Sequence, residues 1–590
     1  MRQTVREFYE RAERADFTAV VDDHGRHTAR DLLDRAAELA EAMTPDGTPG
    51  GTVLLQADNS WRTVAATLAA GMTGGVLALV NRHTTRAEFA AALEDIRPDA
   101  VIAEPSALEE WHAPGSGTPP LPGARPAEAL DGWTVLAGRG PRDVSRWSGG
   151  TLIGLTSGST GRPKGVVQSE SAVRYACTCT IDVNGLRDGD AVAAVVPLSS
   201  TAAYCFGVCL ALMLGGPLVL SGRWDREQAL ARMAAHNVRW TMCVPTMALQ
   251  MGSAAAGSRV LDGVRSITVG GGPMDRGALA RAERSLGTRI LRVFGMSECL
   301  GHTSPRPDDP EGIRLGRDGR PFPGTELRAV DADGTALGPG RTGRAQVRGP
   351  SLFLGYAHDG KVESPALTPD GFFPTGDLLM TGDDGTVTVM GREKDVIIRG
   401  GRNLDITEIE RAVASHPGVA RVCVAPVPDP LLGERAAVLV VAEAEAGTHG
   451  EGDGTGGGAG IGLDEITEHL ARTGLSKAKW PEFAFSVSEL PQTTVGKLDR
   501  SAARGLAHEL HARLAARQEP HRHTDREPHR QADQEQHGQP DHERHGQPDQ
   551  ERHGQPDHER HGQPDHERHG QPDHERHGQP DHEQHRQGDA

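Results

Sequence analysis

LTSGSTGRPKGVV, residues 155–167, is the stretch of this 590-residue chain that most strongly constrains its fold. The apolar run TLIGL at 151–155 leads into it and predicts a buried strand that ends in a loop of small and hydroxyl residues. Small residues let backbone N–H groups approach phosphate oxygens closely, and Lys164 adds a positive charge. The stretch therefore predicts a strand followed by a phosphate-binding loop. A passive Gly/Ser linker is the alternative, which the strand and the lysine disfavour.

The lysine in this loop does not follow the common P-loop pattern. That pattern places Ser or Thr directly after Gly-Lys, whereas here Pro163 precedes Lys164 and Gly165 follows it. The loop is therefore of a different kind. The neighbouring residues that we expect to bind phosphate are Thr156, Ser157, Gly158, Ser159, Thr160 and Gly161.

Strands and helices alternate on both sides of the loop. This alternation predicts a parallel sheet covered by helices, and it extends to about residue 145 and again from 151 to about 320. The Pro- and Gly-rich residues 112–150 between the two stretches predict a surface loop. The clearest segments are a helix at 30–43, a strand at 52–57, a helix at 61–74 and a strand at 74–80.

The pattern changes after residue 325. Short strands with Gly turns predict an all-β subdomain, in which GRAQVRGPSLFLGY (343–356) is a structural motif without chemistry. We expect an α/β fold with a large N-terminal domain at 1–392, made of two α/β subdomains and a small β subdomain. A hinge at 393–394 then joins it to a small α+β C-terminal lid domain at 395–512.

The last stretch, 517–590, is of low complexity. An octapeptide close to HGQPDHER begins at His537 and recurs from 545, 553, 561, 569 and 577. It contains almost no apolar residues to offset the entropy of ordering, so it predicts a disordered tail. The imidazoles could bind Ni²⁺ or Zn²⁺, but a passive repeat expansion is the interpretation we favour.

Composition excludes several classes of protein. The formal charge of −18, without a basic stripe, disfavours a nucleic-acid binder. No stretch reaches the ~20 apolar residues of a membrane span, and the charged N-terminus does not resemble a secretory signal. The seven cysteines lack paired zinc spacing and predict buried thiols in a reducing compartment. We therefore expect a cytoplasmic protein.

Further motifs follow the loop in a specific order: VGGGPM (269–274), VFGMSE (293–298), FFPTGDL (372–378), GREKDVIIRGGRNLDITEIE (391–410) and LPQTTVGKLDR (490–500). Together with the loop they resemble the signatures of the AMP-forming adenylating superfamily. That superfamily contains acyl- and aryl-CoA synthetases, peptide-synthetase adenylation domains and luciferases. The resemblance covers about residues 10 to 505. The look of the chain is closest to short- or medium-chain acyl-CoA synthetases.

The resemblance implies that ATP binds along these motifs. The glycine segment would line the adenine and acyl sites, the aromatic motif would lie beside adenine and the α-phosphate, and the aspartate of the Thr-Gly-Asp motif would accept hydrogen bonds from the ribose. The implied nucleotide-binding residues are Gly271, Gly272, Pro273, Phe294, Gly295, Met296, Ser297, Asp377 and Arg392. Lys394 falls at the implied hinge.

The resemblance also implies a catalytic set. Lys497 would reach the acyl carboxylate and the α-phosphate, and Glu298 would hold Mg²⁺, for which a carboxylate is a suitable hard ligand. Positive charge from Mg²⁺, Lys164 and Lys497 would stabilise attack of an anionic carboxylate on the α-phosphorus with release of pyrophosphate. The lid domain would then rotate and expose the acyl-adenylate to a thiol.

The acid and the thiol are less constrained. VVPLSSTAAYCFG (195–207) aligns with the family's acyl pocket and places Ser200 and Thr201 there. Hydroxybenzoate ligases typically have His-Asn at this point, and amino-acid adenylating domains have an aspartate nearby. We therefore expect a small-molecule acid without an α-amino group, such as a short- or medium-chain or alicyclic acid. CoA is the expected acceptor because no carrier domain follows.

Three alternatives remain open. A stand-alone acyl-AMP ligase could load a separate acyl or peptidyl carrier protein in natural-product biosynthesis. A catalytically dead nucleotide-binding regulatory protein is disfavoured because all the implied charged residues are present. In the third alternative, the His-rich tail stores metal ions and the folded domains only support that role.

Overall fold

The computed structural model describes residues 1–111, 121, 123–156, 162–255, 257–272, 274, 276–400, 402–443, 461–493 and 496–518. The predictions for 157–161, Pro273 and most of the repeat tail lie outside the described residues. Contacts group Met1–Pro520 into one compact unit. None of the described helices combines the length and apolar character that a bilayer crossing requires.

The strand before the phosphate loop lies inside a mixed sheet. Its central strands β5, β3, β4 and β8 are parallel, and β9 returns antiparallel to β8, so the loop joins two neighbouring strands. The order is β21 (Lys361–Glu363), β20 (Gly355–His358), β9 (Lys164–Ser169), β8 (Gly150–Thr156), β4 (Val76–Val80), β3 (Thr52–Gln56), β5 (Ala100–Ala103), β7 (Trp133–Ala137) and β6 (Arg125–Ala129).

The prediction of a surface loop over 112–150 is wrong for its second half. β6 and β7 form an antiparallel hairpin, and β7 pairs with β5 at the edge of the sheet. Leu130, Asp131 and Gly132 make the turn with positive φ angles of 51°, 55° and 93°. Asp-Gly before the apolar run of β7 is a hairpin signal that outweighs the Pro and Gly content around it.

A second sheet carries the other α/β layer. Its strands β14 to β1 are parallel, and β2 adds an antiparallel edge. The order is β14 (Arg289–Arg292), β13 (Ser266–Val269), β12 (Trp240–Cys243), β10 (Val192–Ala194), β11 (Leu218–Leu220), β1 (Thr18–Asp22) and β2 (Gly25–Thr28).

The helices of the N-terminal region follow from apolar spacing and side-chain caps. Thr28 and Thr85 each form a capping box with an acidic residue three positions on, which satisfies free N–H groups at the helix start. α3 is buried on nearly every face. The helices are α1 (Arg2–Arg14), α2 (Ala29–Met43), α3 (Trp61–Thr73), α4 (Arg86–Ile96), α5 (Pro105–Trp111), α6 (Glu170–Asn184), α7 (Thr201–Ala203), α8 (Leu210–Leu214), α9 (Arg226–Ala235), α10 (Pro245–Ala255), α11 (Arg276–Leu286) and α12 (Glu311–Arg314), with a π-helical segment at Tyr204–Cys209.

The expected β subdomain is confirmed, with one difference. β18 (Glu326–Val330), β19 (Thr342–Arg348), β22 (Phe373–Thr381) and β23 (Val387–Arg392) form its antiparallel sheet. The end of the 343–356 motif instead enters β20, which pairs with β9 beside the phosphate loop. The motif therefore links the subdomain to the loop that we expect to bind phosphate. A small sheet of β15 (Phe294–Met296), β16 (Cys299–Ser304) and β17 (Arg320–Pro321) lies before it in the chain.

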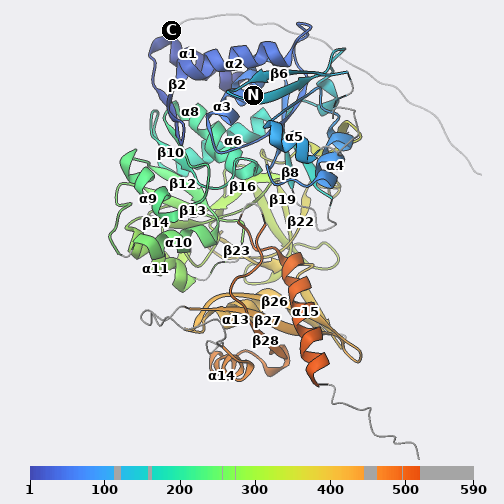
Figure 1. The fold of residues 1–590 in the computed structure, drawn as a ribbon. Coiled ribbons are helices and arrows are strands. Elements are labelled where there is room, and N and C mark those ends of the chain that lie inside the picture. Colours follow the sequence, from blue (N-terminus) through green and yellow to red (C-terminus); the bar gives the residue numbers. More distant parts are fainter. Residues whose placement is uncertain are drawn as a thin grey trace, which may run out of the picture. The chain divides into compact units, whose positions relative to one another are not determined.

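The C-terminal region has the expected α+β character and is orange to red in Figure 1. Its sheet has the order β25 (Arg402–Asp405), β24 (Val396–Arg399), β27 (Gly433–Ala442) and β26 (Val419–Asp429), with β28 (Phe483–Ser486) parallel to β27. The helices α13 (Ile406–Ala414), α14 (Leu463–Thr473) and α15 (Arg500–Gln518) accompany it. The exact domain boundaries stay predictions.

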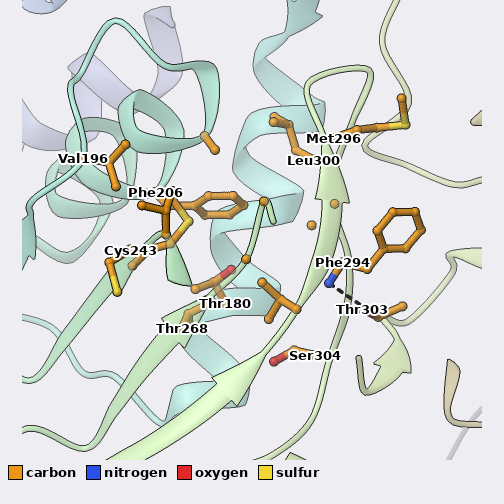
Figure 2. A pocket seen from close by; sticks show the side chains of 18 of the residues that line it. Thr180, Val196, Phe206, Cys243, Thr268, Phe294, Met296, Leu300, Thr303 and Ser304 are labelled. Atoms are coloured by element: carbon orange, nitrogen blue, oxygen red, sulfur yellow. Dashed lines mark hydrogen bonds between the residues drawn. The ribbon is translucent and has the colours of Figure 1, made fainter. Parts of the chain in front are cut away.

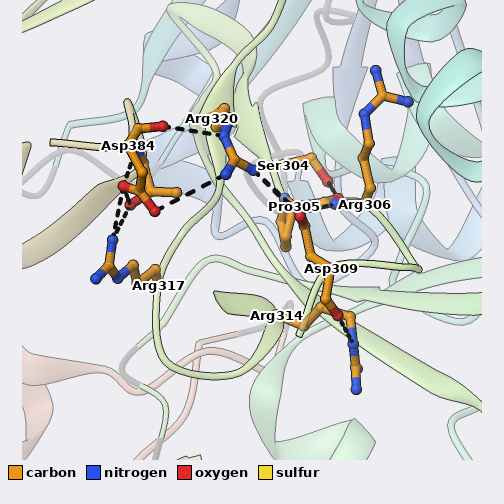
Figure 3. A network of polar contacts seen from close by, with 9 residues as sticks. Ser304, Pro305, Arg306, Asp309, Arg314, Arg317, Arg320 and Asp384 are labelled. Atoms are coloured by element: carbon orange, nitrogen blue, oxygen red, sulfur yellow. Dashed lines mark hydrogen bonds and ion pairs between the residues drawn. The ribbon is translucent and has the colours of Figure 1, made fainter. Parts of the chain in front are cut away.

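A polar network fixes the segment between β16 and β17 (Figure 3). Arg317 and Arg320 both contact Asp384 in the β22–β23 turn. Arg320 also contacts Asp309, whose carbonyl accepts from Arg314. These charge-assisted bonds hold the chain that follows the β15–β16 hairpin against the β subdomain.

Candidate active site

A cavity of about 120 Å³ opens where parallel strands of the second sheet end. The residues at and after the ends of β12, β13 and β14 all line it, as ligands in open α/β sheets bind outside the carboxyl ends of strands. Figure 2 shows Phe206, Cys243 and Thr268 in the part that holds these strand ends, and Phe294, Met296 and Leu300 on the β15–β16 hairpin. Lys497 is the one charged side chain among the described residues that line the cavity.

The β15–β16 hairpin brings the predicted aromatic motif into this cavity. Phe294, Gly295, Met296 and Ser297 all line it. Thr303 holds the hairpin closed by accepting the Phe294 N–H at 3.4 Å, drawn in Figure 2. A side chain at Gly295 would meet the Gly301 backbone at 3.1 Å, so the two strands cross too closely for any larger residue without adjustment.

A buried histidine supports the aromatic ring of this motif. His302 lies edge-on to Phe294 with ring centroids 4.7 Å apart. Burial lowers the pKa of His302 to about 3, so the imidazole is neutral. A contact with the Cys299 backbone opposes this shift only weakly. The contact between His302 and Phe294 is therefore apolar packing that fixes the orientation of Phe294.

Lys497 enters the cavity on a tight turn of the C-terminal region. Thr493 and Lys497 bond to each other through their backbones, with the Thr493 N–H donating to the Lys497 carbonyl at 2.7 Å. Gly496 in the turn has a φ of +77°. Its carbonyl accepts from the Thr246 hydroxyl at 3.3 Å, which ties the turn to the start of α10.

The lysine side chain passes directly over the glycine segment. A side chain on Gly271 would lie 2.8 Å from Lys497 Cε and 2.9 Å from Nζ, so the absent side chain provides the space for the lysine. The residue as a whole is exposed, but its ammonium end is enclosed at this point. Burial, and then the nearby Arg392, lower the pKa of Lys497.

Lys164 and Glu298 meet at one tyrosine. The Lys164 Nζ lies 5.1 Å from the ring centroid of Tyr356, and the Tyr356 hydroxyl donates to Glu298 Oε1 at 2.9 Å. Neither Lys164 nor Glu298 forms an ion pair with a described residue. Both side chains therefore contact the same tyrosine and remain available to a ligand. The expectation from sequence that Lys164, Lys497 and a cation on Glu298 converge on one phosphorus stays a prediction.

Asp377 and Arg392 form the remaining polar part of the site. Asp377 is 4% exposed, and its Oδ1 accepts from Arg392 Nε at 3.1 Å across the β22–β23 pair. Burial raises the pKa of Asp377, while Arg392 opposes that rise. The Asp377 N–H donates to the Thr375 hydroxyl at 3.1 Å, which orients the strand.

The other predicted residues are placed less centrally. Ser200 lines the cavity, whereas Thr201 packs its hydroxyl against Gly154 of β8 and is not among the lining residues. Lys394 is exposed in the turn between β23 and β24, where a hinge would lie. Thr156 pairs with Lys164 across the base of the phosphate loop. Gly272 follows Gly271, and their roles stay predictions.

Sequence reasoning missed two groups of site residues. Tyr356 ends the 343–356 motif, to which the sequence analysis assigned no chemistry. Its position beside β9 becomes apparent only when β20 pairs with β9. Polar residues Thr180, Asn184 and Thr268 also line the cavity, and Thr268 accepts from Trp240 Nε1 at 2.9 Å. These residues lie among apolar neighbours in the sequence, so no motif distinguished them from ordinary core residues.

The residues present fit a nucleotide and a divalent cation. Glu298 is a half-buried carboxylate, and the described residues offer no partner to its second oxygen, so it can act as a cation ligand. Asp377 is a nearly buried carboxylate, and hydroxyl donors would stabilise its charged form. The absent side chain at Gly271 leaves room for the end of Lys497, and the absent side chain at Gly295 leaves room for the Gly301 backbone.

Two protein-family models match the chain. The model described as AMP-binding enzyme matches residues 8–357, and the model described as AMP-binding enzyme C-terminal domain matches 408–497. The first covers more than half of the chain. Both matches contain motifs that point into the cavity, including the Lys497 turn.

Curated relatives and solved structures extend this result. A Streptomyces protein named salicylyl-CoA synthase / salicylate adenylyltransferase is 32% identical over 515 residues, covering 83% of this chain and 90% of the relative. A Mycobacterium tuberculosis protein named salicyl-AMP ligase / salicyl-S-ArCP synthetase is 28% identical over 505 residues, covering 81% and 85%. ATP-bound MatB from Rhodopseudomonas palustris superposes with a TM-score of 0.70 at 23% identity, covering 86% of this chain and 99% of MatB. The structural match establishes the fold.

Proposed function

The chain belongs to the AMP-binding enzyme family, and from this premise we propose that it activates an aryl carboxylic acid without a second charged group as its acyl-adenylate and transfers the acyl group to a thiol. It is an AMP-forming ligase that uses ATP. The observation that carries the proposal is the position of Lys497. Its ammonium lies over Gly271 in the same cavity that Phe294 and Ser297 line.

The adenylation step would rely on fixed positive charge. A carboxylate oxygen of the acid attacks the α-phosphorus of ATP, and the bond to pyrophosphate breaks. Lys497 would bridge the acid and the α-phosphate, while Lys164 would neutralise the departing phosphates. Each such donor contributes about 10²–10³-fold in rate. A Mg²⁺ ion held by Glu298 would supply further charge stabilisation.

The nucleotide would be held by groups that do not react. Phe294 would stack on the adenine, in the orientation that His302 supports. The Asp377 carboxylate would accept hydrogen bonds from the ribose hydroxyls, which would favour its charged form despite burial. Arg392 contacts Asp377 and would move with the hinge near Lys394.

The lining of the cavity supports an acid without a second charge. Among the described lining residues, Lys497 is the only charged side chain, so an α-ammonium or a second carboxylate on the acyl group would have no partner. Phe206 and Trp240 provide aromatic walls for a planar ring. The relatives' names refer to salicylate, which favours an aryl acid over the alicyclic or short-chain acid expected from sequence. The absence of Asn beside Ser200 still disfavours recognition of a hydroxybenzoate by the usual His-Asn pair.

The thiol is proposed in the same way. The relatives' names include both CoA and an S-linked ArCP acceptor. They therefore support a carrier protein, the alternative acceptor considered from sequence, at least as strongly as CoA. In the second step the thiol sulfur attacks the acyl carbon, AMP leaves with the electron pair of the anhydride oxygen, and a thioester forms.

Acid-dependent exchange of pyrophosphate into ATP tests the first step. Within a panel of aryl, alicyclic, short-chain and amino acids, exchange is expected with aryl acids that carry no second charged group. Addition of CoA or of phosphopantetheinylated carrier proteins then identifies the acceptor from thioester formation. A Lys497→Ala variant should bind ATP but lose exchange by about 10²–10³-fold. No exchange with any acid on the panel would defeat the proposal.

A further inference from the structure

We propose that Tyr356 is a positioning residue that keeps Lys164 and Glu298 apart and orients the Glu298 carboxylate toward a divalent cation. The inference rests on the proposed function, because it assigns the cation to the nucleotide site. It goes beyond the predicted site, in which the 343–356 motif was structural only. Three sets of contacts support it.

The first set places the tyrosine between two functional segments. The chain from Leu352 to Tyr356 contacts the turn that contains Glu298, since the Phe353 N–H donates to the Glu298 carbonyl at 2.7 Å. It also contacts β9, since the Leu354 N–H donates to the Val167 carbonyl at 2.9 Å. Tyr356 itself pairs with Val166 in the β9–β20 ladder. The ring is thus fixed relative to both segments by backbone bonds.

The second set concerns the hydroxyl. Tyr356 donates to Glu298 Oε1 at 2.9 Å. A carboxylate oxygen can only accept a hydrogen bond, so the phenol hydroxyl is the donor in this contact. A donated hydrogen bond to one oxygen fixes the carboxylate rotamer and leaves the other oxygen free for a cation. Ligand carboxylates held by such a bond are pre-organised.

The third set concerns the ring face. The Lys164 ammonium lies 5.1 Å from the ring centroid, within the range of a cation–π contact. The lysine is exposed and has no ion-pair partner among the described residues. The Tyr356 ring therefore gives the ammonium a neutral resting place. Phe353 packs edge-on against the same ring at 4.9 Å and prevents it from tilting away.

These contacts have an electrostatic consequence. A lysine and a glutamate that could reach each other would form an ion pair, and each would then lose its affinity for the ligand of opposite charge. With Tyr356 between them, the ammonium stays available for phosphate oxygens and the carboxylate stays available for the metal. The tyrosine thus preserves two opposite charges within one small site.

Binding of ATP across a range of Mg²⁺ concentrations, measured by calorimetry without any acid, tests the inference. Tyr356→Phe keeps the ring and removes the donor, so the half-saturating Mg²⁺ concentration should rise about 3- to 10-fold. ATP affinity at saturating Mg²⁺ should change by less than about twofold. Tyr356→Leu removes the spacer as well and should produce a larger rise.

Two comparisons separate positioning from general damage. Tyr175→Phe removes a hydroxyl that donates to the Pro323 carbonyl at 2.7 Å and not to Glu298, and should leave the Mg²⁺ dependence unchanged. In a Glu298→Gln background, Tyr356→Phe should have no further effect on Mg²⁺, because the two residues act through one carboxylate. Thermal unfolding of each variant checks that it is folded.

The outcomes distinguish the two proposals. An unchanged half-saturating Mg²⁺ concentration in folded Tyr356→Phe, or an undiminished effect in the Glu298→Gln background, overturns the role of Tyr356 even if acid activation is intact. A shifted Mg²⁺ dependence without any acid-dependent exchange supports Tyr356 and defeats the proposed function. Failure of the unsubstituted protein to bind ATP with Mg²⁺ overturns both.

Discussion

Substitution of Gly271 by alanine should damage catalysis far more than stability. The added Cβ would lie 2.8 Å from Lys497 Cε and 2.9 Å from Nζ. Carbon contacts relax at about 3.5–4.0 Å, so the end of the lysine must move by roughly 1 Å. That movement costs the fold little, because the displaced atoms are the flexible end of a side chain. The left-handed backbone at Gly271, with φ +83°, adds about 1–2 kcal/mol of strain.

The cost to catalysis follows from what the displaced atoms do. A reacting group misplaced by about 1 Å can lose about 10²-fold in rate, so acid-dependent pyrophosphate exchange should fall by that order in Gly271→Ala. Thioester formation from a synthetic acyl-adenylate should fall much less, because Lys497 is expected to leave the site before that step. The two half-reactions, assayed separately, therefore report on the lysine.

Gly334→Ala is the matched control. Gly334 has a φ of +85°, and a Cβ there meets nothing within 4 Å, so the variant carries the same backbone strain without the clash. It should retain full exchange with a similar loss of thermal stability. The reasoning is refuted if folded Gly271→Ala exchanges within about threefold of the unsubstituted protein, or if both half-reactions fall together.

Three further outcomes follow from the same contacts. Burial and Arg392 lower the pKa of Lys497 from the usual 10.5, and adenylation needs the protonated lysine, so kcat/KM for exchange should decline with rising pH at an apparent pKa below 10.5. Lys497→Arg should move that decline to higher pH. Coincident pH profiles of the variant and the unsubstituted protein would contradict the assignment. Asp318→Ala leaves Arg292 buried without its carboxylate partner and should reduce the free energy of unfolding, measured by denaturant titration, by about 3–5 kcal/mol. A loss of less than about 1 kcal/mol would contradict this expectation. Burial raises the pKa of Cys243 to about 12, so iodoacetamide at pH 8 should label this thiol only after unfolding. Rapid labelling of the native protein, detected by mass spectrometry, would count against the buried position.

The fold could be predicted from sequence because its main signals are local. Apolar runs such as 52–57 and the helix at 61–74 were correct within two residues, since burial on a regular period leaves a pattern in the chain. The seven cysteines are free and buried, as expected. The hairpin at β6–β7 was missed because its Pro-rich surroundings hid a short turn signal.

Only the site residues that lie within recognised sequence motifs could be predicted. Lys164, Glu298, Phe294 and Lys497 were singled out from their motifs. Phe294 and Lys497 line one cavity, Lys164 and Glu298 contact one tyrosine, and the roles of all four stay predictions. Tyr356 could not be recognised, because its role depends on the pairing of β20 with β9 nearly 190 residues earlier in the chain. The loop residues 157–161 lie outside the described residues, so their contacts stay predictions.

The apolar cavity wall and the charged residues come from different elements of the chain, and this has a consequence for how such a protein changes over time. Thr180, Met242, Cys243 and Thr268 lie on α6, β12 and β13, whereas the charged groups come from other strands and turns. Substitutions in the wall can therefore retune which acid fits without disturbing the machinery that activates it. Directed evolution toward new acids should concentrate its libraries on that wall, and natural divergence of specificity has the same route open to it.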